Sequence, residues 1–487
     1  MSFENLSLYG LLAALVQLAI IVGTILRVIL TRHPPGSAFA WILLTTILPY
    51  AGFALYLMFG ERPIGRLRAK RLRETGQRWQ HFSNHKLTPL GPLPRHLVPH
   101  RTFIRLTAKL AGMPLVTGSR VELKRTSNET LRAIEEDIRR AETSVDMAFY
   151  IFSVQGDVLR IVDALLDAVA RGVRVRILVD DFGSRAFLRS AARRKMSDAG
   201  IEIASALPMR FLRFFGLQRA DLRLHRKIVI VDNRIGYTGS FNMIDPAAYK
   251  DSGDVGHWVD AMVRVTGPGV LPLIAVWAFD WALQPDNDLS DFEDDYEQLM
   301  IPNCGEANVV CVPSGPYQTE DESLLLVLES IARAQSELTL TTPYFIPNEA
   351  VVCALKNAVL RGVDVKLIVP RRCDGALVNW AMRRYFDDLL LGGVKIYLYE
   401  AGMLHTKSIS IDGEVAVFGT LNIDNRSMHL NFELMMAIFD TNFVTELDKL
   451  TDEYIANSSR LEAVRWRKRP LAERMKEGAS YLLSPLL

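Results

Sequence analysis

A short pattern of chemically active residues occurs twice in this chain. A histidine is followed two residues later by a lysine and seven residues later by an aspartate, and each copy continues into a Gly-Ser/Thr-x-Asn turn. One match of this kind could arise by chance, but two in equivalent surroundings indicate a duplicated site. The two copies consist of His225, Lys227, Asp232, Ser240 and Asn242, and of His405, Lys407, Asp412, Thr420 and Asn422.

The duplication extends beyond the motif. Residues 164–175 and 354–365 share an Ala-Leu start and an Arg-Gly-Val end, and each continues into an apolar strand. Apolar β-branched runs alternate with helical patterns in both regions, which is typical of α/β domains. A repeat of this length predicts two similar domains and not a solenoid of short units. We expect these domains at residues 105–283 and 305–487, with an acidic linker at 284–304.

Bulk composition limits the classes of partner. The 487 residues include 57 basic and 55 acidic ones, a net charge of +2, which counts against a nucleic-acid enzyme. The four cysteines form no C-x-x-C pair, so we expect buried, reduced thiols. The sequence shows no cluster typical of a metal site, and we expect neither a metal nor another cofactor.

The first 60 residues predict a membrane anchor. Residues 5–26 and 37–59 carry no charge, and each run is about long enough to cross the hydrocarbon core of a bilayer. We expect two transmembrane helices, at about 6–28 and 37–59, that form a hairpin. A cleaved signal peptide is the weaker alternative, because it would need a basic start and would lack the second apolar run.

Charge around the anchor predicts its orientation. A basic connector at residues 61–104 follows the second span, whereas the turn between the spans carries only Arg32, with Arg27 at the end of the first span. The positive-inside rule then places the large C-terminal part in the cytoplasm. The basic connector would also attract anionic membrane lipids.

Two further segments mix aromatic or apolar residues with basic ones. The first is residues 211–217 with its flanking arginines, and the second is the C-terminal run from Arg465 to Leu487. Such mixtures suit a boundary between lipid and water. An ordinary buried aromatic cluster with solvated charges remains the alternative for both.

The motif is suited to a phosphodiester. We expect a strand over Leu224–Val231 and another over Leu404–Ile411, each with its histidine and lysine on one face and each followed by a hairpin turn. Two lysines, with Ser240, Asn242, Thr420 and Asn422 as hydrogen-bond donors, would stabilise the negative charge that builds on the phosphate oxygens. One imidazole could attack phosphorus while the other protonates the leaving alkoxide, and either histidine could take either part.

The roles of the acidic residues are less uniform. Asp232 and Asp412 lie an odd number of residues after their histidines, so they are either structural residues of the turns or direct participants in catalysis. Asp260 and Glu433 are better candidates to hold the second nitrogen of each imidazole. Ordinary carboxylates at strand ends are the alternative for these two.

These residues carry a family resemblance. Both motifs, their turns and the repeat resemble the phospholipase D superfamily. Four further features are similar to bacterial cardiolipin synthases along nearly the whole chain: Ser37–Trp41 in the N-terminal hairpin, Thr341–Pro347, Leu404–Lys407 and the terminal Ser484–Leu487. Thr420 stands where that family often has serine, and it retains the hydroxyl.

The resemblance implies an α/β fold with two phospholipase D-type domains packed around one shared active site, preceded by the transmembrane hairpin. It also implies a phosphatidyltransferase of the bacterial inner membrane. One phosphatidylglycerol would give its phosphatidyl group to a histidine and release glycerol, and a second would accept the group to form cardiolipin. A membrane-bound phospholipase D hydrolase, or a transferase for another head group, is the alternative; a nuclease and a non-catalytic lipid-binding protein fit less well.

Overall fold

The computed structural model describes residues 3–31, 33, 35–60, 93–208, 221–249, 255–284, 287, 299, 301–316, 321–482 and 484. The N-terminal helices and the α/β body fall into separate compact units, and each is described by itself. Most of the expected basic connector, most of the acidic linker and the aromatic segment at 211–217 lie outside the described residues.

The N-terminal unit begins with a long apolar helix. Helix α1 spans Phe3–Leu30, and its part from Tyr9 to Leu30 is long and apolar enough to cross a bilayer. The second expected span is not one straight helix. It consists of α2 (Pro35–Ile47), α3 (Pro49–Leu55) and a π-helical turn, η1 (Tyr56–Gly60), so the predicted two-helix hairpin is only partly present.

Pro49 accounts for the break. A proline inside a helix lacks the N–H that the preceding turn needs, and it pushes the residue before it out of the helical region. Leu48 accordingly has ψ 72°. The chain then brings Gly52 against Leu44 and Thr45, where a Cβ would lie 2.7 Å from the Thr45 Cα atom. Only glycine permits that approach without a shift of the backbone.

The first half of the body contains one copy of the repeat. After the 3₁₀ helix η2 (Arg95–His100) and α5 (Arg101–Ala111), helices alternate with strands as the sequence predicts. The elements are β1 (Val116–Lys124), α6 (Ser127–Arg139), β2 (Ser144–Phe149), α7 (Val158–Ala170), β3 (Arg174–Asp180), α8 (Arg185–Leu188), α9 (Ala191–Asp198), β4 (Glu202–Ala206), β5 (Ile228–Val231), β6 (Ile235–Gly239), β7 (Trp258–Val259), β8 (Met262–Thr266), η5 (Pro268–Val270) and α10 (Leu271–Ala282).

The second half repeats this order and adds helices at its C-terminal end. Its elements are β9 (Ala307–Ser314), α12 (Glu322–Arg333), β10 (Glu337–Thr341), β11 (Phe345–Ile346), α13 (Glu349–Leu360), β12 (Asp364–Pro370), α14 (Ala376–Leu391), β13 (Lys395–Tyr399), β14 (Met403–Leu404), β15 (Ser408–Ile411), β16 (Val415–Gly419), β17 (Ile423–Asp424), α15 (Asn425–His429), β18 (Glu433–Phe439), α16 (Thr441–Ala456), β19 (Ser458–Arg460), α17 (Ala463–Arg467) and α18 (Leu471–Tyr481).

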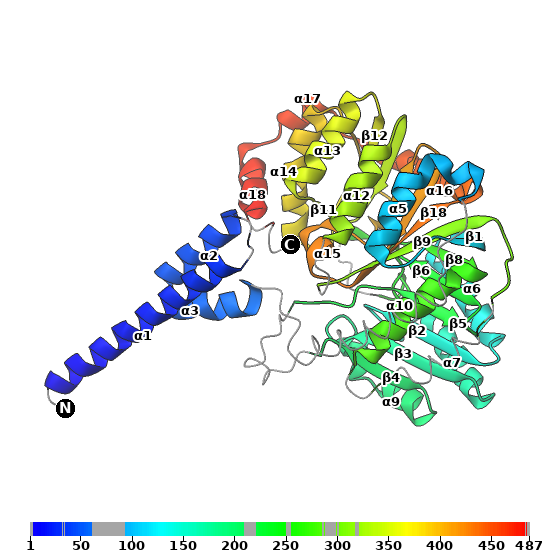
Figure 1. The fold of residues 1–487 in the computed structure, drawn as a ribbon, viewed down its shortest axis with the longest axis horizontal. Coiled ribbons are helices and arrows are strands. Elements are labelled where there is room, and N and C mark those ends of the chain that lie inside the picture. The colour runs from blue at the N-terminus through cyan, green and yellow to red at the C-terminus, as the bar shows by residue number, and fades with distance from the viewer. Residues whose placement is uncertain are drawn as a thin grey trace. The chain divides into compact units, whose positions relative to one another are not determined.

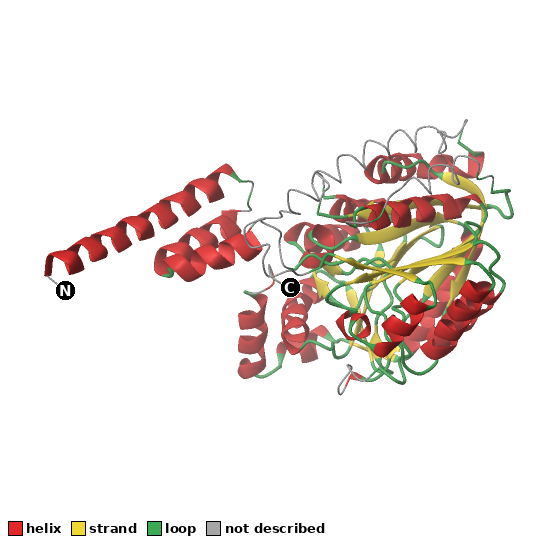
Figure 2. Cartoon of the chain, turned by 90° about the horizontal axis from the view of Figure 1, so that it is seen from below, coloured by secondary structure: helices red, strands yellow, loops and turns green. Residues whose placement is uncertain are grey.

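One continuous sheet joins the two halves (Figure 1). Its strand order is β19-β13-β12-β10-β15-β16-β18-β9-β1-β8-β6-β5-β2-β3-β4, so the two copies meet where β9 pairs antiparallel with β1. From that junction, corresponding strands of the two copies follow in the same order in both directions. The strands lie between layers of helices in Figure 2. This covering explains why central strands such as β2 and β18 are buried along their whole length.

Each motif ends in the tight hairpin that the sequence predicts. Asp232 and Asn233 have φ values of 51° and 53°, and Asp412 and Gly413 have 54° and 68°. Two successive positive φ angles are the signature of a type I′ turn, whose twist matches that of the flanking strands. The turns connect β5 to β6 and β15 to β16 in equivalent registers.

The cysteines only partly match the expectation. All four are unbonded, and Cys311 and Cys373 are buried, but Cys304 and Cys353 are exposed. Burial raises the pKa of the Cys311 thiol well above its ordinary value. The two buried thiols therefore act as small apolar groups of the core.

Candidate active site

The histidine and lysine of each motif lie just before the strand, not within it. The sequence predicted strands over Leu224–Val231 and Leu404–Ile411, but β5 begins at Ile228 and β15 begins at Ser408. His225 and Lys227 therefore lie in the segment that leads into β5. The reason is that these segments pair with the other half of the body instead of with their own sheet.

Two short parallel pairings between the halves position the histidines. Leu224 forms an isolated bridge with Phe432, and the His225 N–H donates to the Phe432 carbonyl at 3.0 Å. In the other half, β14 pairs with β7, and the His405 N–H donates to the Val259 carbonyl at 2.8 Å. Each histidine thus lies beside the residue that follows its backbone partner, which is Phe432 for His225 and Val259 for His405.

That residue is a carboxylate in both cases. The Nδ1 atom of His225 lies 2.8 Å from Oε2 of Glu433, and the Nδ1 atom of His405 lies 2.7 Å from Oδ1 of Asp260. All four side chains are buried. The structure therefore supports the proposed role of Asp260 and Glu433, and it adds that each carboxylate holds the histidine of the opposite half.

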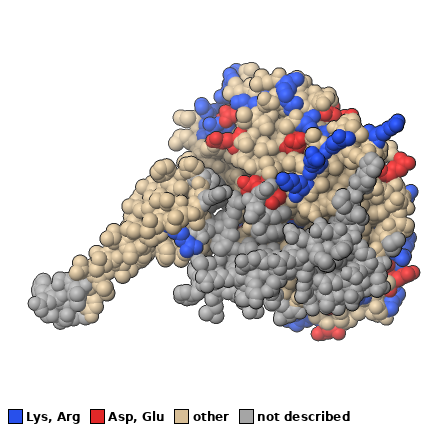
Figure 3. Space-filling model, viewed as in Figure 1, with Lys and Arg blue, Asp and Glu red and all other residues tan. Residues whose placement is uncertain are grey.

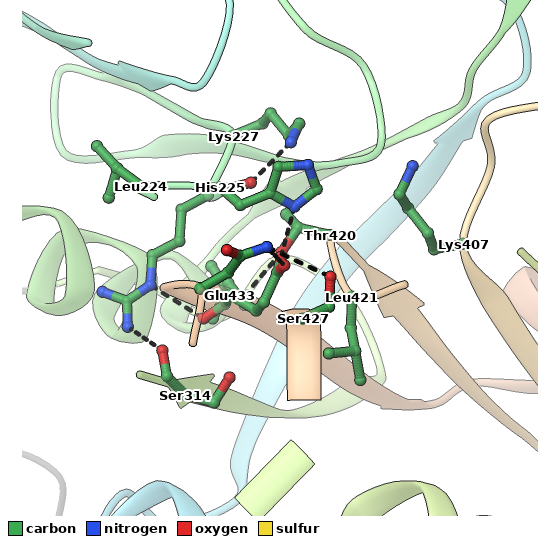
Figure 4. A network of polar contacts seen from close by, with 12 residues as sticks. Leu224, His225, Lys227, Ser314, Lys407, Thr420, Leu421, Ser427 and Glu433 are labelled. Carbon is green, nitrogen blue, oxygen red and sulfur yellow. Dashed lines mark hydrogen bonds and ion pairs between the residues drawn. The ribbon is translucent and has the colours of Figure 1, made fainter. Parts of the chain in front are cut away.

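Further donors hold Glu433 in place (Figure 4). The Thr420 hydroxyl donates to Glu433 Oε2 at 2.5 Å, and the Asn431 amide donates to Oε1 at 3.2 Å. Burial acts against the ionised form, but contacts with His225, Lys227 and Thr420 hold the pKa of Glu433 below its ordinary value. An ionised carboxylate only accepts hydrogen bonds, so the Nδ1 atom of His225 carries the proton.

The same argument applies to the second histidine. Burial opposes ionisation of Asp260, but His405 and Lys407 hold the pKa of this carboxyl below its ordinary value. The Nδ1 atom of His405 consequently donates to Asp260, and the Nε2 atom of each imidazole is left without a proton in the neutral form. Burial lowers the pKa of both histidines to about 4 despite the nearby carboxylates. Both rings are therefore neutral near pH 7 and have a lone pair for attack on phosphorus.

The two lysines bring positive charge to both imidazoles. Lys227 donates to the His225 carbonyl at 2.7 Å, and Lys407 donates to the His405 carbonyl at 2.5 Å. Figure 4 shows the His225 ring with Lys227 beside it and Lys407 across from it. Burial lowers the pKa of Lys227 to about 8 and that of Lys407 to about 7. Two poorly solvated ammonium groups favour the binding of an anion.

The turn residues after each motif are buried beside these groups. The Ser240 hydroxyl accepts from the Ala261 N–H at 3.1 Å, as the Thr420 hydroxyl accepts from the Leu434 N–H at 2.9 Å. The Asn242 carbonyl oxygen accepts from the Ile151 N–H at 3.1 Å, which orients its amide. Asn422 is also buried, in the equivalent position of the second half.

Asp232 and Asp412 have a different environment. The carboxylate of Asp232 accepts hydrogen bonds from the backbone N–H groups of Glu142, Thr143 and Ser144 and from the Thr143 hydroxyl. Asp412 does the same with the backbone of residues 335–337 and the Ser336 hydroxyl. These contacts favour the structural reading of the two aspartates over the catalytic one, because both carboxylates are occupied in fastening the hairpins to the start of β2 and β10.

Two buried residues near the first motif were not found from the sequence. The Arg226 guanidinium donates to the carbonyls of Glu433 and Ser314 in the other half and to Asp280 at 2.6 Å. Asp180 accepts from the Leu224 N–H at 2.8 Å and thereby holds the backbone next to His225. Comparison of the two copies does not reveal either residue, because the second copy has Thr406 in place of Arg226 and Pro370 in place of Asp180.

Aromatic rings also differ between the two histidines. Tyr150 contacts His225 edge to face, with ring centroids 5.3 Å apart, whereas Trp258 lies against His405 at 4.4 Å and a 31° tilt. Within the described residues, no group of three or more His, Cys, Asp or Glu side chains is arranged to hold a metal ion.

Comparisons with known proteins agree with this geometry. A family model described as cardiolipin synthase, PLD-like domain matches residues 134–260 and 327–455, and a model described as phospholipase D-nuclease N-terminal matches residues 19–61. The proteins named cardiolipin synthase A of Yersinia pseudotuberculosis and Proteus mirabilis are each 38% identical over 488 residues, covering 96% of this chain and 96% of the relative.

A solved structure supports the fold. The crystal structure of phosphatidylserine synthase from Haemophilus influenzae matches with a TM-score of 0.58 and 14% identity, and it covers 79% of this chain and 99% of that one. At this identity the likeness concerns the fold alone. With a family model matched in both halves and relatives similar over nearly the full length, the chain belongs to the cardiolipin synthase family of proteins with phospholipase D-like domains.

Proposed function

We propose that this chain is a cardiolipin synthase, a phosphatidyltransferase that forms cardiolipin and glycerol from two molecules of phosphatidylglycerol. The observation that carries the proposal is the pair of buried histidines, each held at Nδ1 by a carboxylate of the opposite half. Two neutral imidazoles beside two ammonium groups suit a two-step displacement at phosphorus. Relatives named cardiolipin synthase A, similar over nearly the full length, support this choice of reaction.

In the first step, the Nε2 atom of one histidine attacks the phosphorus of phosphatidylglycerol. The bond from phosphorus to the glycerol oxygen breaks, and the other histidine donates a proton to that oxygen, so that free glycerol leaves. The anionic phosphodiester stabilises a protonated imidazole and thus opposes the effect of burial on its pKa. Lys227 and Lys407 stabilise the charge that develops on the phosphate oxygens, with Asn242 and Asn422 as further donors.

In the second step, the head-group hydroxyl of another phosphatidylglycerol attacks the phosphohistidine. The neutral histidine removes the hydroxyl proton, the phosphorus–nitrogen bond breaks, and cardiolipin forms. The first histidine regains its lone pair, so no group is consumed. Exclusion of water at this stage separates a transferase from a hydrolase.

The chain is a membrane protein, and we infer that it resides in the bacterial inner membrane with the α/β body in the cytoplasm. Helix α1 supports membrane attachment, and the excess of basic residues after the N-terminal helices supports this orientation. The substrates are then lipids of the same bilayer.

Product analysis tests the reaction. Purified enzyme in phosphatidylglycerol vesicles with labelled head groups is expected to yield cardiolipin and free glycerol in equal amounts, with little phosphatidic acid. His225→Ala and His405→Ala are each expected to abolish turnover, and the double variant should lose no more than either single one, because the two groups act as a unit. Phosphatidic acid as the main product would establish a hydrolase instead.

A further inference from the structure

The outer face of α18 is unusually apolar for a surface helix. Leu471, Met475 and Leu482 have exposed fractions of 69%, 67% and 77%. Their spacings of four and seven residues place them on one side of the helix. Single exposed apolar residues are common, but a row of three on one face indicates a surface that is covered by something.

The acidic residues of α18 point the other way. Glu477 is buried and Glu473 is half-buried, and both accept from the Arg383 guanidinium of α14 at 3.0 Å. Glu477 also accepts from Arg469, which in turn donates to Asp387. These ion pairs fasten α18 to α14 and pair both of its acidic side chains with arginines.

The fully exposed charged side chains between Ala463 and Leu482 are all basic, while the partly exposed Glu473 carboxylate is paired with Arg383. Figure 3 shows Lys and Arg side chains, with some Asp and Glu among them, around the part of the body where α17 and α18 lie. The exposed charged residues of this stretch are Arg465, Arg467, Lys468, Arg474 and Lys476. An apolar row with a mainly basic border matches a membrane with anionic head groups, since lipid charge attracts such residues by about 1 kcal/mol each near the surface.

The end of α18 is connected to the active site. The Tyr481 ring contacts Tyr385, which contacts Phe345 of β11, and β11 pairs with β17, immediately after Asn422. Just beyond the helix, the Ser484 carbonyl accepts from the Asn425 amide at 3.1 Å. The C-terminal end of α18 is therefore linked by side-chain contacts to β11 and to the segment that follows Asn422.

We propose that the face formed by Leu471, Met475 and Leu482, with its basic border, is a membrane-docking surface that inserts into the head-group region of an anionic bilayer. This contact is separate from the N-terminal helices and does not depend on the identity of the reaction. It would hold the site region of the second half close to the lipid surface.

Fluorescence from a single probe tests the proposal in the full-length protein. Met475→Cys, made in a Cys304→Ser/Cys353→Ser background, is labelled with an environment-sensitive dye and reconstituted into vesicles. In vesicles of equal parts phosphatidylglycerol and phosphatidylcholine, we expect a blue shift of the emission and its quenching by spin labels on the acyl chains. Both effects should be weaker in phosphatidylcholine alone. A dye at Leu159→Cys, on α7, serves as the matched control and should show neither effect.

Charge reversal supplies a second arm. Arg474→Glu/Lys476→Glu should reduce the quenching in the anionic vesicles, whereas Arg194→Glu/Lys195→Glu, an equal change of charge on the exposed part of α9, should not. Absence of quenching at Met475→Cys in anionic vesicles would overturn the proposal. A blue shift in detergent that grows with protein concentration would also overturn it, because a second copy of the chain would then cover this face.

Discussion

At the scale of single residues, the site depends on hydrogen bonds that set the protonation state of each imidazole. Glu433 and Asp260 each accept a hydrogen bond from a histidine Nδ1 atom, which leaves Nε2 unprotonated for the proposed role as base or nucleophile. An amide in place of either carboxylate presents a competing donor and allows the imidazole to turn over or change tautomer.

We therefore expect Asp260→Asn and Glu433→Gln to lower kcat by about 10²- to 10⁴-fold, the range in which positioned acid–base groups contribute. The measurement is steady-state cardiolipin formation as a function of pH. In these variants the maximum rate should fall, and the acid limb of the pH–rate profile should shift. Asp448→Asn is the control. The Asp448 carboxylate, on α16, accepts a hydrogen bond from the Ser410 hydroxyl of β15 and is not part of either histidine–carboxylate pair. Equal losses in all three variants would indicate a general loss of folding.

The lowered pKa values of the two lysines predict that the reaction loses efficiency at a lower alkaline pH than ordinary lysines would cause. Burial lowers the pKa of Lys407 to about 7 and that of Lys227 to about 8 from an ordinary value of 10.5. As pH rises, loss of either proton removes positive charge that favours the anionic substrate, so kcat/KM should fall between about pH 7 and pH 9, because this constant reports the free enzyme. A profile that stays flat until the ordinary lysine range would show that the ammonium groups are more stable than their burial indicates.

At the scale of elements, the turns after the motif strands fasten each half together. Asp232 and Asp412 accept backbone hydrogen bonds from the start of the neighbouring strand, in equivalent positions of the two copies. These contacts favour a structural role for the aspartate of each motif, beside the histidine and lysine proposed to act on phosphorus.

Removal of the Asp232 carboxylate should cost stability more than chemistry. We expect Asp232→Ala to lower the free energy of unfolding by about 1.5–3 kcal/mol for each charged hydrogen bond that is not replaced by water, with activity well above that of His225→Ala. The pKa of Asp232 is held below its ordinary value of 3.8 by the backbone N–H groups, against the effect of burial. The stabilisation is therefore complete above that value and is lost as pH falls through the lower folded-state pKa.

Chemical denaturation at neutral and acid pH measures this difference. The gap between the native protein and Asp232→Ala should close at acid pH, and Asp412→Ala should behave in the same way. Loss of turnover in Asp232→Ala equal to that in His225→Ala, with unfolding unchanged, would instead assign the aspartate to catalysis.

At the scale of the whole molecule, the two halves form one catalytic body. A single sheet passes through the junction of β9 and β1, and each histidine takes its carboxylate from the other half. Arg226 adds a buried connection, because its guanidinium binds carbonyl groups of β9 and β18. Neither motif histidine is held by a carboxylate of its own half.

Orientation in the membrane is testable in cells. In a Cys304→Ser/Cys353→Ser background, Gly36→Cys should react with an impermeant thiol reagent once any outer membrane is made permeable, because this position lies at the end of the turn between the apolar segments, where α2 begins. Leu360→Cys, with an exposed fraction of 86% in the body, should react only after the inner membrane is broken. The opposite pattern of labelling would place the body and its site outside the cytoplasm.

The sequence alone determined the duplicated α/β plan and most of the groups that carry the chemistry. The motif, the type I′ turns and the alternation of strands and helices are local patterns, and each depends on residues within about a dozen positions of one another. Asp260 and Glu433 could be named as candidates to hold the imidazoles, but the sequence did not indicate which histidine each one holds. The prediction of one helix over the second apolar segment was only partly confirmed. Hydropathy measures the length of an apolar run, but it does not register that Pro49 breaks the helix within that run.

Only the tertiary structure decided which partner each histidine takes. His225 meets a carboxylate 208 residues away and His405 one 145 residues away, through parallel pairings of a few residues between the halves. Such short pairings leave no periodic pattern in the sequence. They also draw the motif residues out of their own strands, and they explain Arg226 and Asp180, whose partners are backbone groups brought together by the fold. Spacing along the chain specifies which groups are present, but packing between the two halves decides which of them touch.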